Sequence, residues 1–194
     1  MSPRHRTPTE KDPHWRVTPP SSTLLRFVHQ FAPNRHPVLD AGCGFGRNAL
    51  ALALRGLHVV AADRDPMRLS AFVNLTPSYF ARFAGDGTVG EIYTLCTNLA
   101  PSSWPFRRNA FSGITCIHFP EHHLLDAFRF SLRRNGLLYL ETFGGHGQNH
   151  LDLPRAGQLR AVIARDYHLL FYREQPVGPA GCEAVSVKFL ARKV

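Results

Sequence analysis

The sequence predicts an α/β fold in which strands and helices alternate to build a mostly parallel sheet with helices on both faces. Short apolar, β-branched runs alternate along the chain with stretches of helical character. A glycine-rich loop joins the first of these runs to the first strong helix former. Two β-rich segments close the chain, and their closeness in sequence predicts an antiparallel hairpin.

The expected elements follow one another in a regular order. In the first half they are a helix from Ser21 or Ser22 through Phe31, a strand over 37–41, a helix over 47–55, a strand over 57–62, a helix from Asp65 and a strand over 91–96. We expect Asn74-Leu75-Thr76-Pro77 to break the helix from Asp65. The second half holds a strand over 113–117, a helix from Glu121 with Leu132 on its apolar side, a strand over 137–141, a helix over 156–164 and strands over 168–174 and 184–191.

The loop after the first strand is the most informative segment, and residues 40–46 read Asp-Ala-Gly-Cys-Gly-Phe-Gly. Glycines let a backbone turn tightly and approach a ligand, because a Cβ at these positions would occupy the ligand's space. The spacing differs from the dinucleotide fingerprint Gly-x-Gly-x-x-Gly. A carboxylate at Asp40 would repel a pyrophosphate and attract a cationic amino-acid tail. The loop therefore indicates a Rossmann-like site for S-adenosylmethionine rather than NAD.

Asp63 ends the second expected strand, about twenty residues beyond the first glycine, where such folds place an acid against the ribose hydroxyls. We predict this role for Asp63 and include the neighbouring Arg64 in the cofactor site. The alternative is a helix N-cap, for which Asp65 before Pro66 is also well placed. Both can hold, with Asp65 capping the helix and Asp63 binding the cofactor.

Length and composition predict one compact domain over residues 21–194, after a mobile tail over residues 1–20. No apolar run could span a bilayer and the N-terminus has no secretory pattern, so we expect a cytoplasmic protein. The four cysteines lie far apart without a Cys-x-x-Cys pair, which favours buried, reduced side chains over metal ligands or disulfides: Cys43, Cys96, Cys116 and Cys182.

The net charge of +9 admits a nucleic-acid partner, but the arginines are spread along the chain. Arg133 and Arg134 suit the end of the expected helix before them, and no basic segment is interleaved with aromatic residues. We therefore favour a solvated basic surface over an RNA-binding one.

With these pieces in place, the chain resembles the class I S-adenosylmethionine-dependent methyltransferases over roughly residues 15–193. Residues 38–46 match the family's first motif, Asp63 its second-strand acid, residues 111–119 its fourth strand and residues 134–136 the turn before its fifth. Gly-Arg-Asn after the loop and the ending Phe-Leu-Ala-Arg-Lys resemble the small tellurite-resistance-type members. The resemblance implies a seven-stranded sheet whose last strand is antiparallel.

The resemblance also implies a cofactor site, with no metal ion. Asp40 would hold the amino end of S-adenosylmethionine, often through water, and Asp63 its ribose. The other implied contacts are the backbone at Gly42, Cys43, Gly44 and Gly46 along the cofactor, Asn98 and the Leu99 amide at adenine beside residues 104–106, and the backbone near His118 at the methionine part. Asn98 replaces the family's usual aspartate, and an uncharged amide accepts a hydrogen bond more weakly than a carboxylate. Ser112 stands where the family commonly has an acid.

Methyl transfer is an in-line displacement that needs alignment and exclusion of water more than a catalytic dyad. The acceptor would enter above the carboxyl ends of the strands. Residues expected there are Trp15, His118, Phe119, Glu141, His146 and the loop over 144–147. His118 or His146 can act as a base or simply be polar rim residues. Glu141 can orient an acceptor or bond to loop amides.

We expect a small-molecule acceptor, no membrane association, and a monomer or weak dimer. Two alternatives stay open on the same scaffold. One is a non-catalytic protein that binds S-adenosylmethionine or RNA, and the other is an NAD(P)-dependent enzyme. Asp40 and the glycine spacing argue against the second of these.

Overall fold

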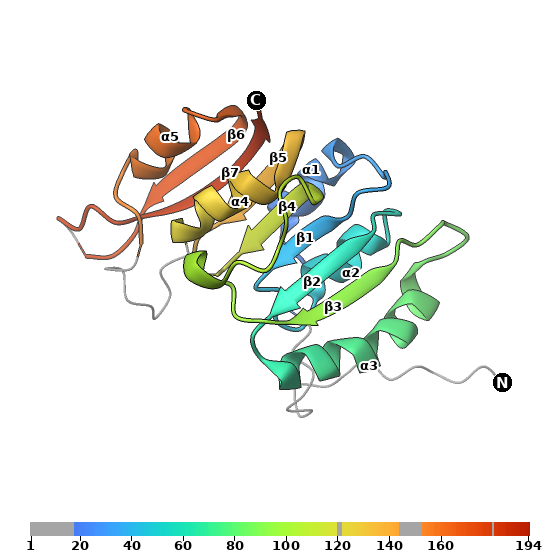
Figure 1. Ribbon diagram of the computed structural model, residues 1–194. Helices are drawn as coiled ribbons and strands as arrows, with labels where there is room; N and C mark the ends of the chain where they lie inside the picture. Colours follow the sequence, from blue (N-terminus) through green and yellow to red (C-terminus); the bar gives the residue numbers. More distant parts are fainter. Residues whose placement is uncertain (1–17, 120–121, 144–152, 180) are drawn as a thin grey trace.

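The computed structural model describes residues 18–119, 122–143, 153–179 and 181–194 (Figure 1). It confirms the α/β class, with a seven-stranded sheet in the order β3-β2-β1-β4-β5-β7-β6. The first five strands pair in parallel, and β7 is antiparallel to both β5 and β6, as expected of a terminal hairpin. The strands are β1 Val38–Ala41, β2 Val59–Asp63, β3 Ile92–Cys96, β4 Phe111–Ile117, β5 Leu132–Glu141, β6 Tyr167–Pro176 and β7 Val185–Lys193.

Helices cover both faces of the sheet, as predicted (Figure 1). Helices α4 and α5 pack on one face, while α1, α2 and α3 pack on the other. Among the described residues, no helix has the length and apolar character needed to cross a membrane. The helices are α1 Ser22–Phe27, η1 Val28–Gln30, α2 Arg47–Ala53, α3 Pro66–Phe83, η2 Pro101–Ser103, η3 His122–Leu124, α4 Leu125–Ser131 and α5 Gln158–Ile163.

The core is divided by the sheet because successive side chains of a strand point to opposite faces. Leu39 joins the cluster under α4 and α5, and Val38 joins the cluster under α1, α2 and α3. All four residues of β1 are buried. This central position fixes Asp40 and the loop that follows it at the middle of the sheet's carboxyl edge.

Helix α3 corrects the predicted break at residues 74–77, because it continues to Phe83 with Pro77 inside it. Asp65 caps the start of the helix, because its carboxylate accepts hydrogen bonds from the amides of Met67 at 2.9 Å and Arg68 at 3.2 Å. Beyond Pro77, Tyr79 and Phe80 pack against the core cluster of this face. This packing keeps the last turns helical although Pro77 cannot donate a backbone hydrogen bond.

Strand β5 is longer than the expected 137–141, and α4 ends one residue before Leu132. The predicted turn over 134–136 lies inside this strand, as an irregularity in its pairing with β4. Asn135 has a φ of 62° there. At Gly136 a Cβ would lie 2.8 Å from the Arg133 carbonyl oxygen, so the bend requires glycine.

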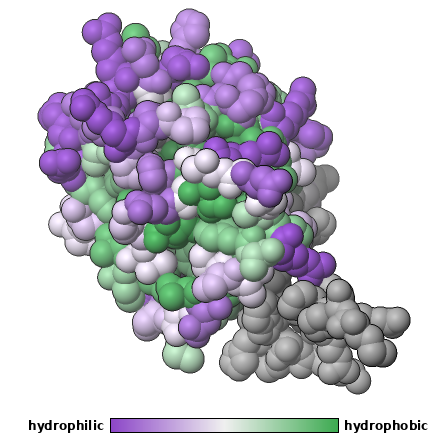
Figure 2. Space-filling view, turned by 90° about the vertical axis from the view of Figure 1, so that its right-hand side faces the viewer, coloured by the Kyte–Doolittle hydropathy of each residue, from purple (hydrophilic) through white to green (hydrophobic). Residues whose placement is uncertain are grey.

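The edge strand β3 is more exposed than the central strands. Figure 2 looks onto the side that lies at the right of Figure 1, where hydrophobic residues gather between hydrophilic ones. Tyr93 on β3 and Val73 on α3 are among the exposed apolar side chains of the molecule.

The prediction that the cysteines are buried is confirmed for two of the four. Cys43 and Cys116 are buried, but Cys96 at the end of β3 is exposed and Cys182 is half-buried. All four are free thiols.

Candidate functional site

The glycine loop lies at the carboxyl edge of the sheet, and all three of its glycines have positive φ: Gly42 70°, Gly44 55° and Gly46 76°. A Cβ on Gly42 would collide with the Phe119 ring, and one on Gly46 with the Phe72 ring. At Gly44 nothing lies within 4 Å of the position a Cβ would take. Only Gly44 therefore leaves open space for a ligand, while the other two glycines make room for aromatic rings.

Asp63 is hydrogen-bonded to the backbone of the glycine loop. Its Oδ2 accepts a hydrogen bond from the Gly44 amide at 2.8 Å, and its Oδ1 accepts one from the Asp65 amide at 2.9 Å. The structure confirms Asp65 as the cap of α3, while Asp63 hydrogen-bonds to the glycine loop. Each carboxylate oxygen has a second lone pair, so these two bonds leave Asp63 able to accept from a ligand hydroxyl.

Asp40 is buried at the end of β1, with only 1% of its surface exposed. Its Oδ1 accepts from the Thr115 hydroxyl at 2.9 Å, whereas its Oδ2 has no hydrogen-bond partner among the described residues. Burial raises the pKa of the Asp40 carboxyl to about 6, although the Thr115 bond opposes that shift. A buried carboxylate oxygen without a partner is energetically costly and would gain from a cationic group.

The end of β3 lies beside Asp63, whose carbonyl oxygen accepts from the Thr97 amide at 2.9 Å. Asn98 is exposed at this point, and Leu99 is buried in the core beneath it. Trp104 turns inward and donates from Nε1 to the Ser131 hydroxyl at 2.7 Å, with its ring against Phe128 of α4. Asn98 is therefore the accessible polar side chain here, while Trp104 is part of the packing.

His118 follows β4 in a left-handed conformation, with φ of 55°. Its Nδ1 lies 3.2 Å from the Arg47 guanidinium and its Nε2 lies 3.7 Å from Glu141 Oε2. Because arginine can only donate, Nδ1 accepts and the ring proton is on Nε2. Burial and the charge of Arg47 lower the pKa of His118, which keeps the ring neutral near pH 7.

Glu141 is the centre of a buried polar cluster at the end of β5. Its Oε1 accepts from the hydroxyls of Ser21 and Tyr139, and its Oε2 accepts from the Lys188 ammonium at 2.9 Å. Burial alone would raise the pKa of Glu141, but these hydrogen bonds and the Lys188 charge hold it below its usual value. The carboxylate is 1% exposed, so its lone pairs are directed to the protein rather than to solvent.

Sequence reasoning missed several members of this edge. Tyr139 lies two residues before Glu141, so strand periodicity places both on one face of the sheet, and this signal was available. Lys188 could not be found in this way, because its pairing opposite Glu141 depends on the register of β5 with β7. Arg47 and Asn48 of α2 were also missed, although they bind the Pro19 carbonyl at 2.9 Å and the Ser21 amide at 3.0 Å.

A cavity of about 580 Å³ opens at the glycine loop, between α2 and α3. Of the predicted site residues, Gly42, Cys43, Gly44 and His118 line it. Arg64 is exposed on the turn after β2. The predicted residues Trp15 and His146, and the loop over 144–147, lie outside the described residues.

Comparisons with known proteins agree with this geometry. The model of the family described as tellurite resistance protein TehB matches residues 11–79, which include the glycine loop and Asp63. A search of the curated proteins finds no matching sequence.

Solved structures share the fold at low sequence identity. A methyltransferase from Methanosarcina mazei has a TM-score of 0.64 and 17% identity, over 87% of this chain and 97% of its own. TehB from Haemophilus influenzae has a TM-score of 0.65 and 18% identity, over 90% of this chain and 62% of its own. Magnesium protoporphyrin IX methyltransferase from Synechocystis, solved with bound S-adenosylhomocysteine, has a TM-score of 0.63 and 14% identity, over 89% and 80%. These findings confirm the expected fold, and over residues 11–79 the family match agrees with the resemblance to tellurite-resistance-type proteins.

Proposed function

We propose that this chain is a class I S-adenosylmethionine-dependent methyltransferase of the TehB type, and that it methylates a small-molecule acceptor that enters beside His118. The family match and the shared fold support S-adenosylmethionine as the cofactor. The observation that carries the proposal is the open position at Gly44, with Asp63 bonded to the Gly44 amide and the unpartnered Asp40 oxygen at the end of the strand before the loop.

The residues present fit the proposed cofactor. The unpartnered Asp40 Oδ2 suits a cationic amino group, reached directly or through a water molecule. Asp63 Oδ1 and Oδ2 retain lone pairs for ribose hydroxyls, and the exposed amide of Asn98 can accept from the adenine amine. The backbone of Gly42, Cys43 and Gly44 would lie along the cofactor because no Cβ at Gly44 blocks the approach.

When bound, S-adenosylmethionine supplies a methyl group on a sulfonium whose thioether is a good leaving group. The chain's part is to orient the acceptor and to exclude water. His118, with Arg47 on one side and Glu141 on the other, lines the cavity. Lys188 is already paired with Glu141, so it is the Arg47 guanidinium beside His118 that would favour an acceptor with an anionic or deprotonated nucleophile.

A neutral His118 would take up a proton at Nδ1, but this nitrogen accepts a hydrogen bond from Arg47. His118 can therefore serve as a base only if that hydrogen bond breaks. Glu141 accepts from Ser21, Tyr139 and Lys188, and these three donors hold it ionised. We therefore propose Glu141 as a positioning residue that fixes Lys188 and the His118 ring. In this proposal the acceptor's own acidity supplies the nucleophile, and His118 orients it.

Calorimetric titration with S-adenosylhomocysteine and with NADH tests the cofactor. We expect S-adenosylhomocysteine alone to bind, and tight binding of NADH alone would favour a nicotinamide enzyme instead. Because Asp63 also holds the Gly44 amide, weaker binding by Asp63→Ala cannot separate a ribose contact from a damaged loop.

A 2′-deoxy analogue of S-adenosylhomocysteine distinguishes a ribose contact of Asp63 from damage to the glycine loop. If Asp63 accepts from the ribose, the wild type should bind the analogue at least about tenfold more weakly, and Asp63→Asn should lose most of this discrimination. Asp65→Ala, which loses the cap of α3 and the ion pair with Arg68 but keeps the Asp63 carboxylate, is the matched control and should discriminate like the wild type. Equal discrimination by the wild type and Asp63→Asn would remove Asp63 from the ribose site.

Methylation of cell metabolites with methyl-labelled S-adenosylmethionine identifies the acceptor. We expect label in low-molecular-weight, acidic fractions with the wild type and little with Asp63→Ala. Label recovered only in protein or nucleic acid would overturn the small-molecule acceptor. Binding of S-adenosylhomocysteine without transfer to any fraction would favour the non-catalytic alternative.

A further inference from the structure

A second recess lies away from the glycine loop, where the loop before β1 meets the bend of β5. It encloses about 370 Å³, within the range of small-ligand sites. The register of the sheet separates it from the candidate active site, because the pairing of β5 with β7 has Leu137 opposite Arg192 at one end and Glu141 opposite Lys188 at the other. The recess is therefore not an extension of the proposed cofactor cavity.

Its lining is strongly cationic. Arginines come from three separate segments, namely Arg35 before β1, Arg133 and Arg134 at the bend of β5, and Arg192 near the end of β7. None of the described residues that line it is an aspartate or glutamate, and none of these arginines forms a salt bridge with a described acidic residue. Converging cations without carboxylates repel one another, and a bound anion would relieve this repulsion.

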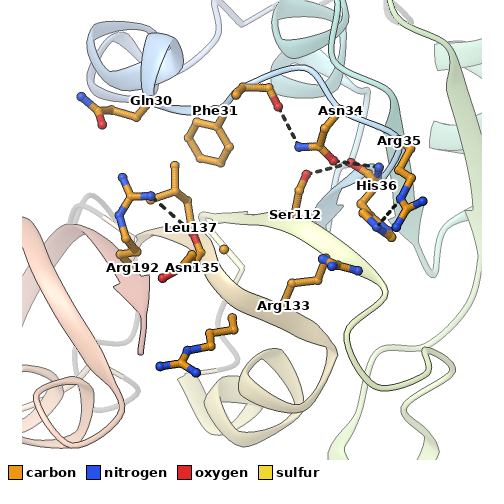
Figure 3. Close-up of a pocket in the computed structure, with 13 residues that line it drawn as sticks. Gln30, Phe31, Asn34, Arg35, His36, Ser112, Arg133, Asn135, Leu137 and Arg192 are labelled. Carbon is orange, nitrogen blue, oxygen red and sulfur yellow. Dashed lines mark hydrogen bonds between the residues drawn. The ribbon is translucent and has the colours of Figure 1, made fainter.

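Figure 3 shows how these side chains lie around the recess. Arg133 extends toward Arg35 and His36, which are joined by a bond of 3.2 Å from Arg35 Nε to His36 Nε2. Arg192 lies on the other side, with Nη1 3.4 Å from the Asn135 carbonyl oxygen. Burial and the charges of Arg133, Arg35 and Arg107 lower the pKa of His36.

The backbone around the recess determines where the arginines and His36 lie. Asn135 with positive φ and Gly136 without a Cβ form the bend that carries Arg133 and Arg134. Ser112 fixes the opposite wall, because its hydroxyl donates to the His36 carbonyl at 2.8 Å. Phe31 is the aromatic residue of the lining and is 6% exposed, so it offers no platform on which nucleic-acid bases could stack.

We propose that this recess is a binding site for a small, multiply charged phosphate-bearing ligand, held by Arg35, Arg133, Arg134 and Arg192. Planar guanidinium groups bind phosphate oxygens in pairs, and here they approach from different elements rather than along one track. A concave site of this size with a buried aromatic ring favours a small anion over an RNA strand. The proposal is independent of the methyltransferase activity.

Titration with inorganic pyrophosphate at constant ionic strength tests this proposal, because pyrophosphate lacks the nucleoside for which the glycine loop is built. We expect saturable binding to the wild type and a rise in its melting temperature with ligand concentration. Arg133→Ala and Arg192→Ala should each weaken binding by about tenfold or more, and Arg133→Lys should weaken it less.

Arg155→Ala is the charge-matched control, since Arg155 is exposed at the opposite edge of the sheet and, among the described residues, its side chain pairs with Glu183 alone across 3.7 Å. Its affinity for pyrophosphate should equal that of the wild type. Equal weakening by Arg155→Ala, or no binding by the wild type at millimolar concentrations, would overturn the proposal. A single-stranded RNA that binds more tightly than pyrophosphate and is lost with the same variants would also overturn it, in favour of nucleic acid.

Discussion

Two buried carboxyl groups on neighbouring parts of the sheet edge show how strongly the surroundings decide their ionisation. Asp40 and Glu141 are each 1% exposed. Glu141 has a side-chain donor for each oxygen, one of them an ammonium, so its pKa is lowered, whereas burial outweighs the hydrogen bonds to Asp40 and raises its pKa to about 6. Keeping the Asp40 carboxyl buried and ionised therefore lowers the stability of the free protein. Such a cost is typical of a functional site.

We predict that Asp40→Asn removes a pH-dependent cost to stability. The folded pKa is above the unfolded value of 3.8, so the wild type should lose stability as pH rises from about 4 to about 6 and stay lower above that. The full difference corresponds to at most about 3 kcal/mol, because one pKa unit is about 1.4 kcal/mol. Urea unfolding at a series of pH values measures it.

The informative quantity is the difference between the wild type and the variant. Asp86→Asn, an exposed change of the same kind, should follow the wild-type pH profile. Asp40→Asn should also bind S-adenosylhomocysteine more weakly, if the carboxylate faces its amino group. An identical pH profile for the wild type and Asp40→Asn would contradict the raised pKa.

At the level of elements, α3 shows how far tertiary packing can override a local signal. Pro77 deprives the Val73 carbonyl of its helical donor, yet the helix continues for six residues to Phe83. The Thr76 hydroxyl adds a hydrogen bond to the Phe72 carbonyl at 2.9 Å, and Phe72 itself is fully buried under Gly46. The helix is therefore anchored at the glycine loop before the proline is reached.

Pro77→Ala should stabilise the protein, because it restores the missing backbone donor inside a helix. We expect a gain of about 1–3 kcal/mol and a rise in melting temperature of about 2–4 °C per kcal/mol. Pro105→Ala, in an exposed loop, should give no gain, since proline there restricts the unfolded chain without interrupting a helix. A loss of stability on Pro77→Ala would mean that the helix is strained in another way.

The same comparison explains what the sequence could predict. The class of each element, the hairpin and the loop after β1 follow from local patterns, because strand and helix periodicity are local properties. The continuation of α3 and the early start of β5 at Leu132 do not, since each depends on packing between distant segments. Asp40 and Asp63 could be chosen from spacing, but the contacts of Glu141 with Ser21 and Lys188 depend on the folded sheet.

Across the whole molecule, residues 18–21 tie the start of the described chain to the edge where the site lies. Arg47 binds the Pro19 carbonyl, Asn48 accepts from the Ser21 amide, and the Ser21 hydroxyl donates to Glu141. Ser21 Oγ also accepts from the Leu24 amide at 3.1 Å and so caps α1. One hydroxyl thus joins α1 to β5 beside the glycine loop.

Ser21→Ala should therefore destabilise the protein by more than the loss of a helix cap, which costs about 1 kcal/mol. Removing the donor to a buried carboxylate adds a cost of about 1–3 kcal/mol at neutral pH. The lowered pKa of Glu141 contributes stability that is present above its unfolded value of 4.5 and is lost as pH falls through the folded pKa. The stability gap between the wild type and Ser21→Ala should therefore be largest near pH 7 and narrow toward pH 4.

Ser22→Ala removes the hydroxyl of an exposed neighbour and is the control for the sequence change. Ser21→Thr keeps the hydroxyl and should restore most of the stability. A gap that stays constant with pH would reduce Ser21 to a helix cap and disconnect it from Glu141.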